Sequence, residues 1–218
     1  MAPVREVKER TRQEIEAGLA QEQANGKRTA ICAFLAAAIG LFAGFYGGIG
    51  IVGAIVFDKY PNNSPERVLF LNDRSTELTL IGLASAIASL LLIPVLVFLY
   101  RAVKLRRPQL PSVAIFCAIV GPVLLAVGGF AYQIAIGVAA NDFATTGNQT
   151  YNEAKAAFES SGITISQIVL QAGVIALGFA FVLIGLNAMR TGLITRFMGV
   201  LAIISGVLFV LPIGSPAP

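Results

Sequence analysis

Five long apolar stretches, separated by polar and charged segments, dominate the chain. They lie at about residues 31–57, 78–100, 112–139, 164–189 and 197–213. Crossing a hydrocarbon layer of roughly 30 Å as a helix takes about 20 residues, a length that the first four reach and the fifth approaches. The pattern predicts an all-α integral membrane protein with a bundle of five transmembrane helices.

The first 28 residues predict a separate helix. Apolar side chains recur there at three- and four-residue steps from Val4 to Leu19, and Asn25-Gly26 is typical of a helix stop. We expect residues 1–28 to form a cytosolic amphipathic helix and residues 29–218 to form the transmembrane domain. The helix would lie on the membrane surface, pack on the inner loops, dock on a partner, or be solvated.

Two of the polar segments contain helix starts. Ser64-Pro65-Glu66 combines a hydroxyl cap, a proline and an acid in the first turn, and Thr150-Tyr-Asn-Glu153 fits a capping box. They predict a short surface helix in each outer loop, the second ending near Ser160 with Gly162 as its stop. The two starts are 86 residues apart, which indicates either a parallel internal repeat or chance spacing.

Positive charge is distributed unequally between the polar segments. Twelve of the 16 Lys and Arg residues fall in alternate segments that begin with the N-terminal one, and four fall in the others. Cytoplasmic loops carry the excess of Lys and Arg, so we expect the N-terminus inside. Five spans would then place the C-terminus outside.

Reactive side chains are missing from the middle of the apolar stretches. The chain has no histidine, the commonest catalytic base and metal ligand, and no charged residue lies at mid-depth. Ser85 and Ser89 have no base at depth to activate them. With no zinc spacing, phosphate-binding loop or nucleic-acid patch either, we expect no catalytic residue, metal, cofactor or nucleic-acid partner, and no enzymatic activity.

Small residues recur at every fourth position of the first stretch, at Ala36, Gly40, Gly44 and Gly48. They share one face of a helix, and in lipid such faces let helix backbones approach closely. Each glycine gives up roughly 1 kcal/mol of helix propensity against alanine, which favours a packing role. The face would contact another helix of the chain, a second protein or a lipid.

A few polar side chains lie at membrane depth. Tyr132 and Gln133 fall in the outer half of the third stretch, and Gln167 and Gln171 fall one turn apart in the outer half of the fourth. An amide in hydrocarbon needs a hydrogen-bond partner. The four residues either bond between helices or line an outward-facing polar pocket for a ligand.

Two segments resemble a group of uncharacterised bacterial multi-pass membrane proteins. Residues 64–103 open with Ser-Pro-Glu and lead into the second stretch, and residues 189–212 contain the turn Arg190-x-Gly192-Leu193-x-x-Arg196. The resemblance covers most of the chain and implies a bacterial plasma membrane, and a sixth span is expected beyond Pro218. It brings no activity and no functional residues.

Together these observations predict a non-catalytic accessory or structural subunit, or a scaffold, of a membrane complex. It would contact the lipid bilayer and a membrane-protein partner or a second copy. The alternative is a small-molecule or lipid transporter or binding protein that uses the polar residues of the third and fourth stretches.

Overall fold

A computed structural model describes residues 16–17, 20, 24–41, 64–146 and 148–210, and the regular structure within these ranges is helical. Residues 24–41 form one helix. The labelled helices that follow are α2 (Ser64–Asp73), α3 (Ser75–Arg106), α4 (Val113–Thr146), α5 (Tyr151–Phe158), α6 (Ser161–Arg190) and α7 (Arg196–Val210). The all-α class predicted from the sequence is confirmed.

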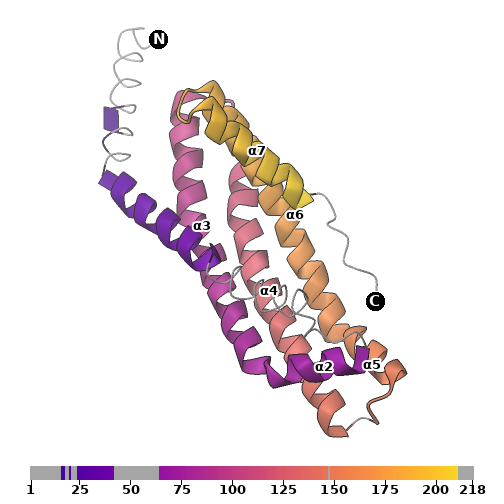
Figure 1. Cartoon of the computed structure of the whole chain (residues 1–218). Helices are drawn as coiled ribbons and strands as arrows, with labels where there is room; N and C mark the ends of the chain where they lie inside the picture. The colour runs from indigo at the N-terminus through magenta and orange to yellow at the C-terminus, as the bar shows by residue number, and fades with distance from the viewer. Residues whose placement is uncertain (1–15, 18–19, 21–23, 42–63, 147, 211–218) are drawn as a thin grey trace, which may run out of the picture.

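Helices α3, α4 and α6 form an elongated bundle in which neighbours along the chain run in opposite directions (Figure 1). Helix α4 packs most extensively on α6 and then on α3, and α7 packs along α6. The short helices α2 and α5 lie across one end of the bundle and contact α4. Residues 24–41 approach α3 where Gly40 lies near Ala88 (Figure 1).

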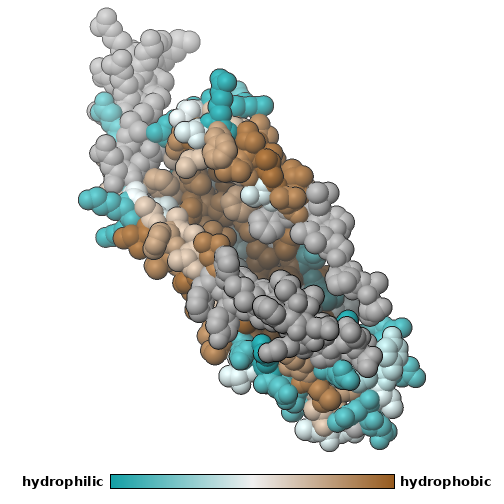
Figure 2. Space-filling model, in the orientation of Figure 1, coloured by the Kyte–Doolittle hydropathy of each residue, from teal (hydrophilic) through white to brown (hydrophobic). Residues whose placement is uncertain are grey.

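Among the residues that the structure describes, three segments are long and apolar enough to cross a membrane: Ser75–Arg106, Val113–Thr146 and Tyr151–Arg190. At 1.5 Å per residue, the 32 residues of α3 span about 48 Å, more than the hydrocarbon layer. Helix α7 is apolar but has only 15 residues. Figure 2 shows apolar residues along the middle of the visible face and hydrophilic residues at both ends. The predicted spans 31–57 and 197–213 extend into residues outside the described ranges.

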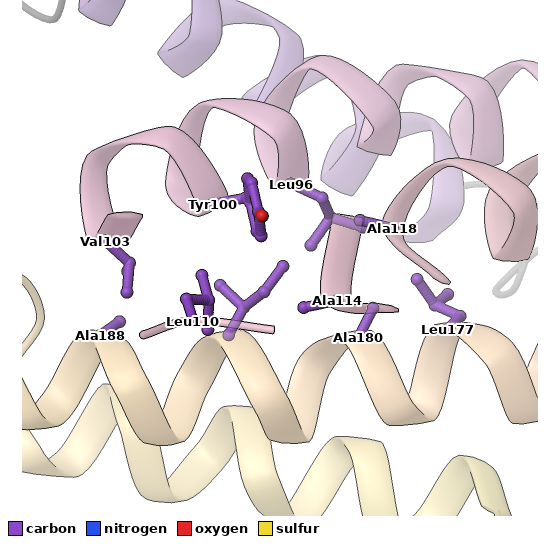
Figure 3. Close-up of a cluster of buried hydrophobic side chains, with 10 residues drawn as sticks. Leu96, Tyr100, Val103, Leu110, Ala114, Ala118, Leu177, Ala180 and Ala188 are labelled. Atoms are coloured by element: carbon purple, nitrogen blue, oxygen red, sulfur yellow. The ribbon is translucent and has the colours of Figure 1, made fainter. Parts of the chain in front are cut away.

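The larger core joins α3, α4 and α6 in the half of the bundle away from α2 and α5, and Figure 3 shows its buried side chains. Its buried members include Leu96 and Tyr100 of α3, Ala114 of α4 and Leu177 of α6. Leu110, from the α3–α4 connection, is only 4% exposed and belongs to the same cluster. A second cluster, formed by Val68, Ala140, Phe143 and Ala154, joins α2 and α5 to α4.

Helices α4 and α6 meet backbone to backbone at three glycines. A Cβ at Gly121 would lie 2.7 Å from the Leu177 nitrogen, and one at Gly128 would lie 2.5 Å from the Leu170 nitrogen. From the other helix, a Cβ at Gly173 would lie 2.7 Å from the Leu125 nitrogen. Side chains of any size would push the helices apart, so glycine at these three positions allows the short distance between the α4 and α6 backbones.

Several boundaries differ from those expected. Residues 140–146, expected in an outer loop, extend α4 because Ala140 and Phe143 are buried against α2 and α5. Gly162 is not a stop but lies in the first turn of α6. Asn25-Gly26 does not end a helix either: residues 24–41 continue through it, with the Thr29 hydroxyl donating to the Asn25 carbonyl at 3.0 Å.

Candidate functional site

The structure brings only part of the predicted polar pocket together. The Gln167 Nε2 of α6 donates to the Tyr132 hydroxyl of α4 at 3.5 Å, so these two residues link the helices. Gln133 packs against α3 instead: a Cβ placed on Gly82 would lie 3.0 Å from the Gln133 Cγ. Gln171 is exposed one turn beyond Gln167. The four residues therefore occupy two different helix interfaces and one exposed surface.

Most other polar side chains in the long helices bond to carbonyls of their own helix. The Ser89 hydroxyl donates to the Ser85 carbonyl at 2.8 Å, and the Asn187 amide donates to the Leu183 carbonyl at 2.8 Å. Ser166, which is 5% exposed, contacts two carbonyls of the preceding turn. In the described ranges, no buried side-chain nitrogen or oxygen lacks a partner. Back-bonding of this kind satisfies the polar groups without a ligand.

The predicted small-residue face is described at its first half. Ala36 is 5% exposed, and a Cβ at Gly40 would lie 3.9 Å from the Ala88 Cβ of α3. The described half of this face therefore packs within the chain. Gly44 and Gly48 lie outside the described residues.

A groove that sequence reasoning missed opens between residues 24–41 and α3, with a volume of about 640 Å³. We call it the basic groove. The first helix contributes Asn25, Arg28, Thr29 and Cys32, and α3 contributes Pro94, Val97, Phe98, Arg101, Lys104 and Leu105. On each helix these positions begin with the pattern i, i+3, i+4, i+7, so each set forms one helical face. The spacing on each helix could be seen in the sequence, but nothing in the sequence indicated that these two helical faces lie opposite each other.

A second cavity, of about 550 Å³, lies between the C-terminal end of α4, α5 and the start of α6. Its lining includes the carboxylates Asp142 and Glu153. Glu153 already accepts from the Thr150 backbone at 3.4 Å as half of the capping box predicted from the sequence. Among the described residues, no three of Cys, Asp or Glu lie close enough to hold a metal ion.

The turn between α6 and α7 gives a physical reason for the motif Arg190-x-Gly192-Leu193-x-x-Arg196. Gly192 has φ +68°, and the Leu193 nitrogen donates to the Ala188 carbonyl at 3.0 Å, while Gly192 donates to Met189 at 3.1 Å. This is a Schellman termination, which needs glycine at the left-handed position and an apolar residue after it. Leu193 packs on the larger core. Thr195 then caps α7 by accepting from the Met198 nitrogen at 3.3 Å.

A family model described as a domain of unknown function (DUF4386) matches residues 29–213. The match covers most of the chain and agrees with the resemblance seen in residues 64–103 and 189–212. Neither a curated protein nor a solved structure matches the chain.

Proposed function

The chain belongs to the DUF4386 family, and we propose that it is a non-catalytic integral membrane protein, an accessory or structural subunit of a membrane complex. It crosses a bacterial plasma membrane five times, with its N-terminus in the cytoplasm. Three of the spans correspond to α3, α4 and α6. The other two include residues 31–57 and α7.

The observation that carries this proposal is the use made of polar groups inside the bundle. Ser89, Ser166 and Asn187 bond to carbonyls of their own helices, and Gln167 bonds to Tyr132. An enzyme or a proton-coupled carrier keeps a reactive or titratable group aimed into a cavity at this depth. Polar side chains whose hydrogen bonds go to backbone carbonyls of their own helix favour a packing role instead.

The orientation is supported by the distribution of charge along the bundle. All six Asp and Glu residues between positions 64 and 210 belong to the segments at the α2–α5 end. Cations there have acidic partners: Arg74 lies 3.8 Å from Glu77, and Lys155 lies 3.8 Å from Glu159. The opposite end carries the basic residues of α3 and α6 without acids of their own, as a cytoplasmic end does.

The surface left for a partner is apolar. Ile165, Ile168 and Phe179 of α6 are more than half exposed, as are Phe197 and Met198 of α7. Lipid or another transmembrane helix covers such side chains equally well, because neither exposes them to water.

The test is native mass spectrometry of the protein extracted from its own membrane in mild detergent. We expect a second protein in fixed ratio, retained through washing. A lone chain that retains one metabolite in fixed ratio would contradict the proposal.

A second candidate, a small-molecule binding protein or transporter, is supported by the exposure of Gln167 and Gln171 on neighbouring turns of α6. The variant Gln171→Leu separates the two. A binding role predicts loss of the retained metabolite at unchanged stability, whereas a packing role predicts no change in bound molecules.

A further inference from the structure

The basic groove is closed at one end and open at the other. It closes where Gly40 meets Ala88, with 3.9 Å between the position of a glycine Cβ and the alanine Cβ. From that contact toward residue 24 the first helix leans away from α3 (Figure 1). The opening lies at the end of the bundle where α3 ends at Arg106, which Arg107 follows.

Polarity changes along the groove in register on both helices. The two helices run in opposite directions (Figure 1). From the contact of Gly40 with Ala88, Arg28 is 12 residues along one helix, and Arg101 and Lys104 are 13 and 16 residues along the other. Cys32 and Pro94 are nearer to that contact, at 8 and 6 residues. Seven residues separate Pro94 from Arg101, which is about 10 Å of helix. The groove therefore has cations at its mouth and an apolar floor along one and a half to two turns below them.

The described residues at the mouth carry charges of one sign. Arg28, Arg101 and Lys104 line it, and none of the described lining residues is acidic. Lys104 is held in place, because its Nζ donates to the Tyr100 hydroxyl at 3.2 Å and Tyr100 is only 3% exposed. Arg28 and Arg101 are exposed, and neither forms an ion pair with another described residue. Three neighbouring cations repel one another, and an anion between them removes that repulsion.

The apolar floor restricts which anion fits. Inorganic phosphate would satisfy the arginines but leave Val97, Phe98 and Pro94 uncovered. An extended acidic peptide would bring unpaired backbone groups to membrane depth, where no water satisfies them. A molecule with a phosphate at one end and a hydrocarbon chain behind it satisfies both parts of the groove. Arginine also holds phosphate oxygens in two parallel hydrogen bonds.

We propose that the basic groove binds one anionic phospholipid, with its phosphate between Arg28, Arg101 and Lys104 and an acyl chain along Val97 and Phe98. Basic pockets between transmembrane helices at the cytoplasmic surface recognise lipid headgroups in this way. The inference rests on the membrane placement proposed above. It does not depend on a protein partner.

The test uses the full-length protein purified in mild detergent and titrated with phosphatidylglycerol or phosphatidylcholine, with the bound lipid counted by native mass spectrometry. We expect one phosphatidylglycerol to be retained and phosphatidylcholine to be lost. The variant Arg28→Gln/Arg101→Gln should weaken phosphatidylglycerol binding about 25-fold, from about fivefold for each of the two cations.

The control is Arg190→Gln/Arg196→Gln, which removes two cations from the same end of the bundle but outside the groove. It should change binding less than about twofold, by the same rule applied to charges that do not touch the lipid. Equal weakening by both pairs would overturn the proposal, because the attraction would then be a general property of this basic end. Equal retention of the two lipids by the unmodified protein would also overturn it.

The apolar half is tested by Val97→Trp, which fills the floor and leaves every cation in place. We expect it to abolish phosphatidylglycerol retention at an unchanged elution volume. Photocrosslinking with a phosphatidylglycerol that carries a diazirine on its acyl chain reports the site directly, without a mutation. Adducts on peptides containing Cys32 or Val97 support the proposal, and adducts spread over α6 and α7 refute it. Displacement of the lipid by millimolar inorganic phosphate alone would refute the role of the floor.

These assays contain only the purified chain and lipid. Their failure would leave the accessory-subunit proposal untouched. Absence of a protein partner in the native extract would in turn leave the lipid site untouched.

Discussion

Gly128 and Gly129 are neighbours in α4, but their substitution by alanine should have opposite effects. A Cβ at Gly128 would lie 2.5 Å from the Leu170 nitrogen and 2.9 Å from its Cα, both backbone atoms of α6. A Cβ at Gly129 would lie 3.6 Å from the Leu170 Cδ1, an ordinary contact with a side chain that can move. Only the first substitution forces the helices apart.

The magnitude follows from these distances. Ordinary contacts begin at 3.4 Å, so Gly128→Ala requires the backbones to separate by about 0.9 Å at this point. Overpacking of this kind costs about 1–3 kcal/mol, and alanine recovers about 1 kcal/mol of helix propensity. We expect Gly128→Ala to lose about 2 kcal/mol when the cost is at the upper end of that range. Gly129→Ala should gain up to about 1 kcal/mol.

The assay is SDS-induced unfolding in mixed micelles, with the folded fraction read by pulse proteolysis. The matched pair cancels effects of composition and position, since both variants add one methyl group to adjacent residues of one helix. If the two variants unfolded at the same midpoint SDS concentration, the backbone contact between α4 and α6 would be refuted. A more stable Gly128→Ala would refute it as well.

Three further changes test local features. Gly192→Ala places a side chain at φ +68° and should cost about 1–2 kcal/mol in the same SDS titration, and a cost near zero would contradict the Schellman turn. Thr150→Ala removes the capping box and should destabilise α5 by about 1 kcal/mol, seen as faster hydrogen exchange of the α5 amides at unchanged exchange in α6. Tyr132→Phe removes the acceptor of Gln167; because that bond is long, at 3.5 Å, we expect a loss below about 1 kcal/mol, and a larger loss would indicate a shorter bond in lipid.

The helical class and the short helices were predictable because their signals are local. Long apolar runs are typical of spans, and Thr150 with Glu153 specified the start of α5 correctly. Residues 140–146 were assigned to a loop because Asn141 and Asp142 are polar. The burial of Phe143, which extends α4, depends on α2 and α5 and could not be read locally.

The α4–α6 contact and the basic groove were not predicted for a common reason. A helix that is apolar on every side carries no stripe to show which face meets protein and which meets lipid. Gly121 and Gly128 are seven residues apart and so share a face, which was a usable signal. The groove needed in addition the pairing of residues 24–41 with α3, which only the three-dimensional arrangement supplies.

The central claim is that α3, α4 and α6 cross the membrane with the basic loops inside, and accessibility of single cysteines in intact cells tests it most directly. With Cys32 and Cys117 replaced by alanine, cysteines are introduced at Gln109, Lys155 and Thr195. A membrane-impermeant maleimide should label position 155 in intact cells and positions 109 and 195 only after permeabilisation. Labelling of position 109 or 195 in intact cells, or protection of position 155, would contradict the account.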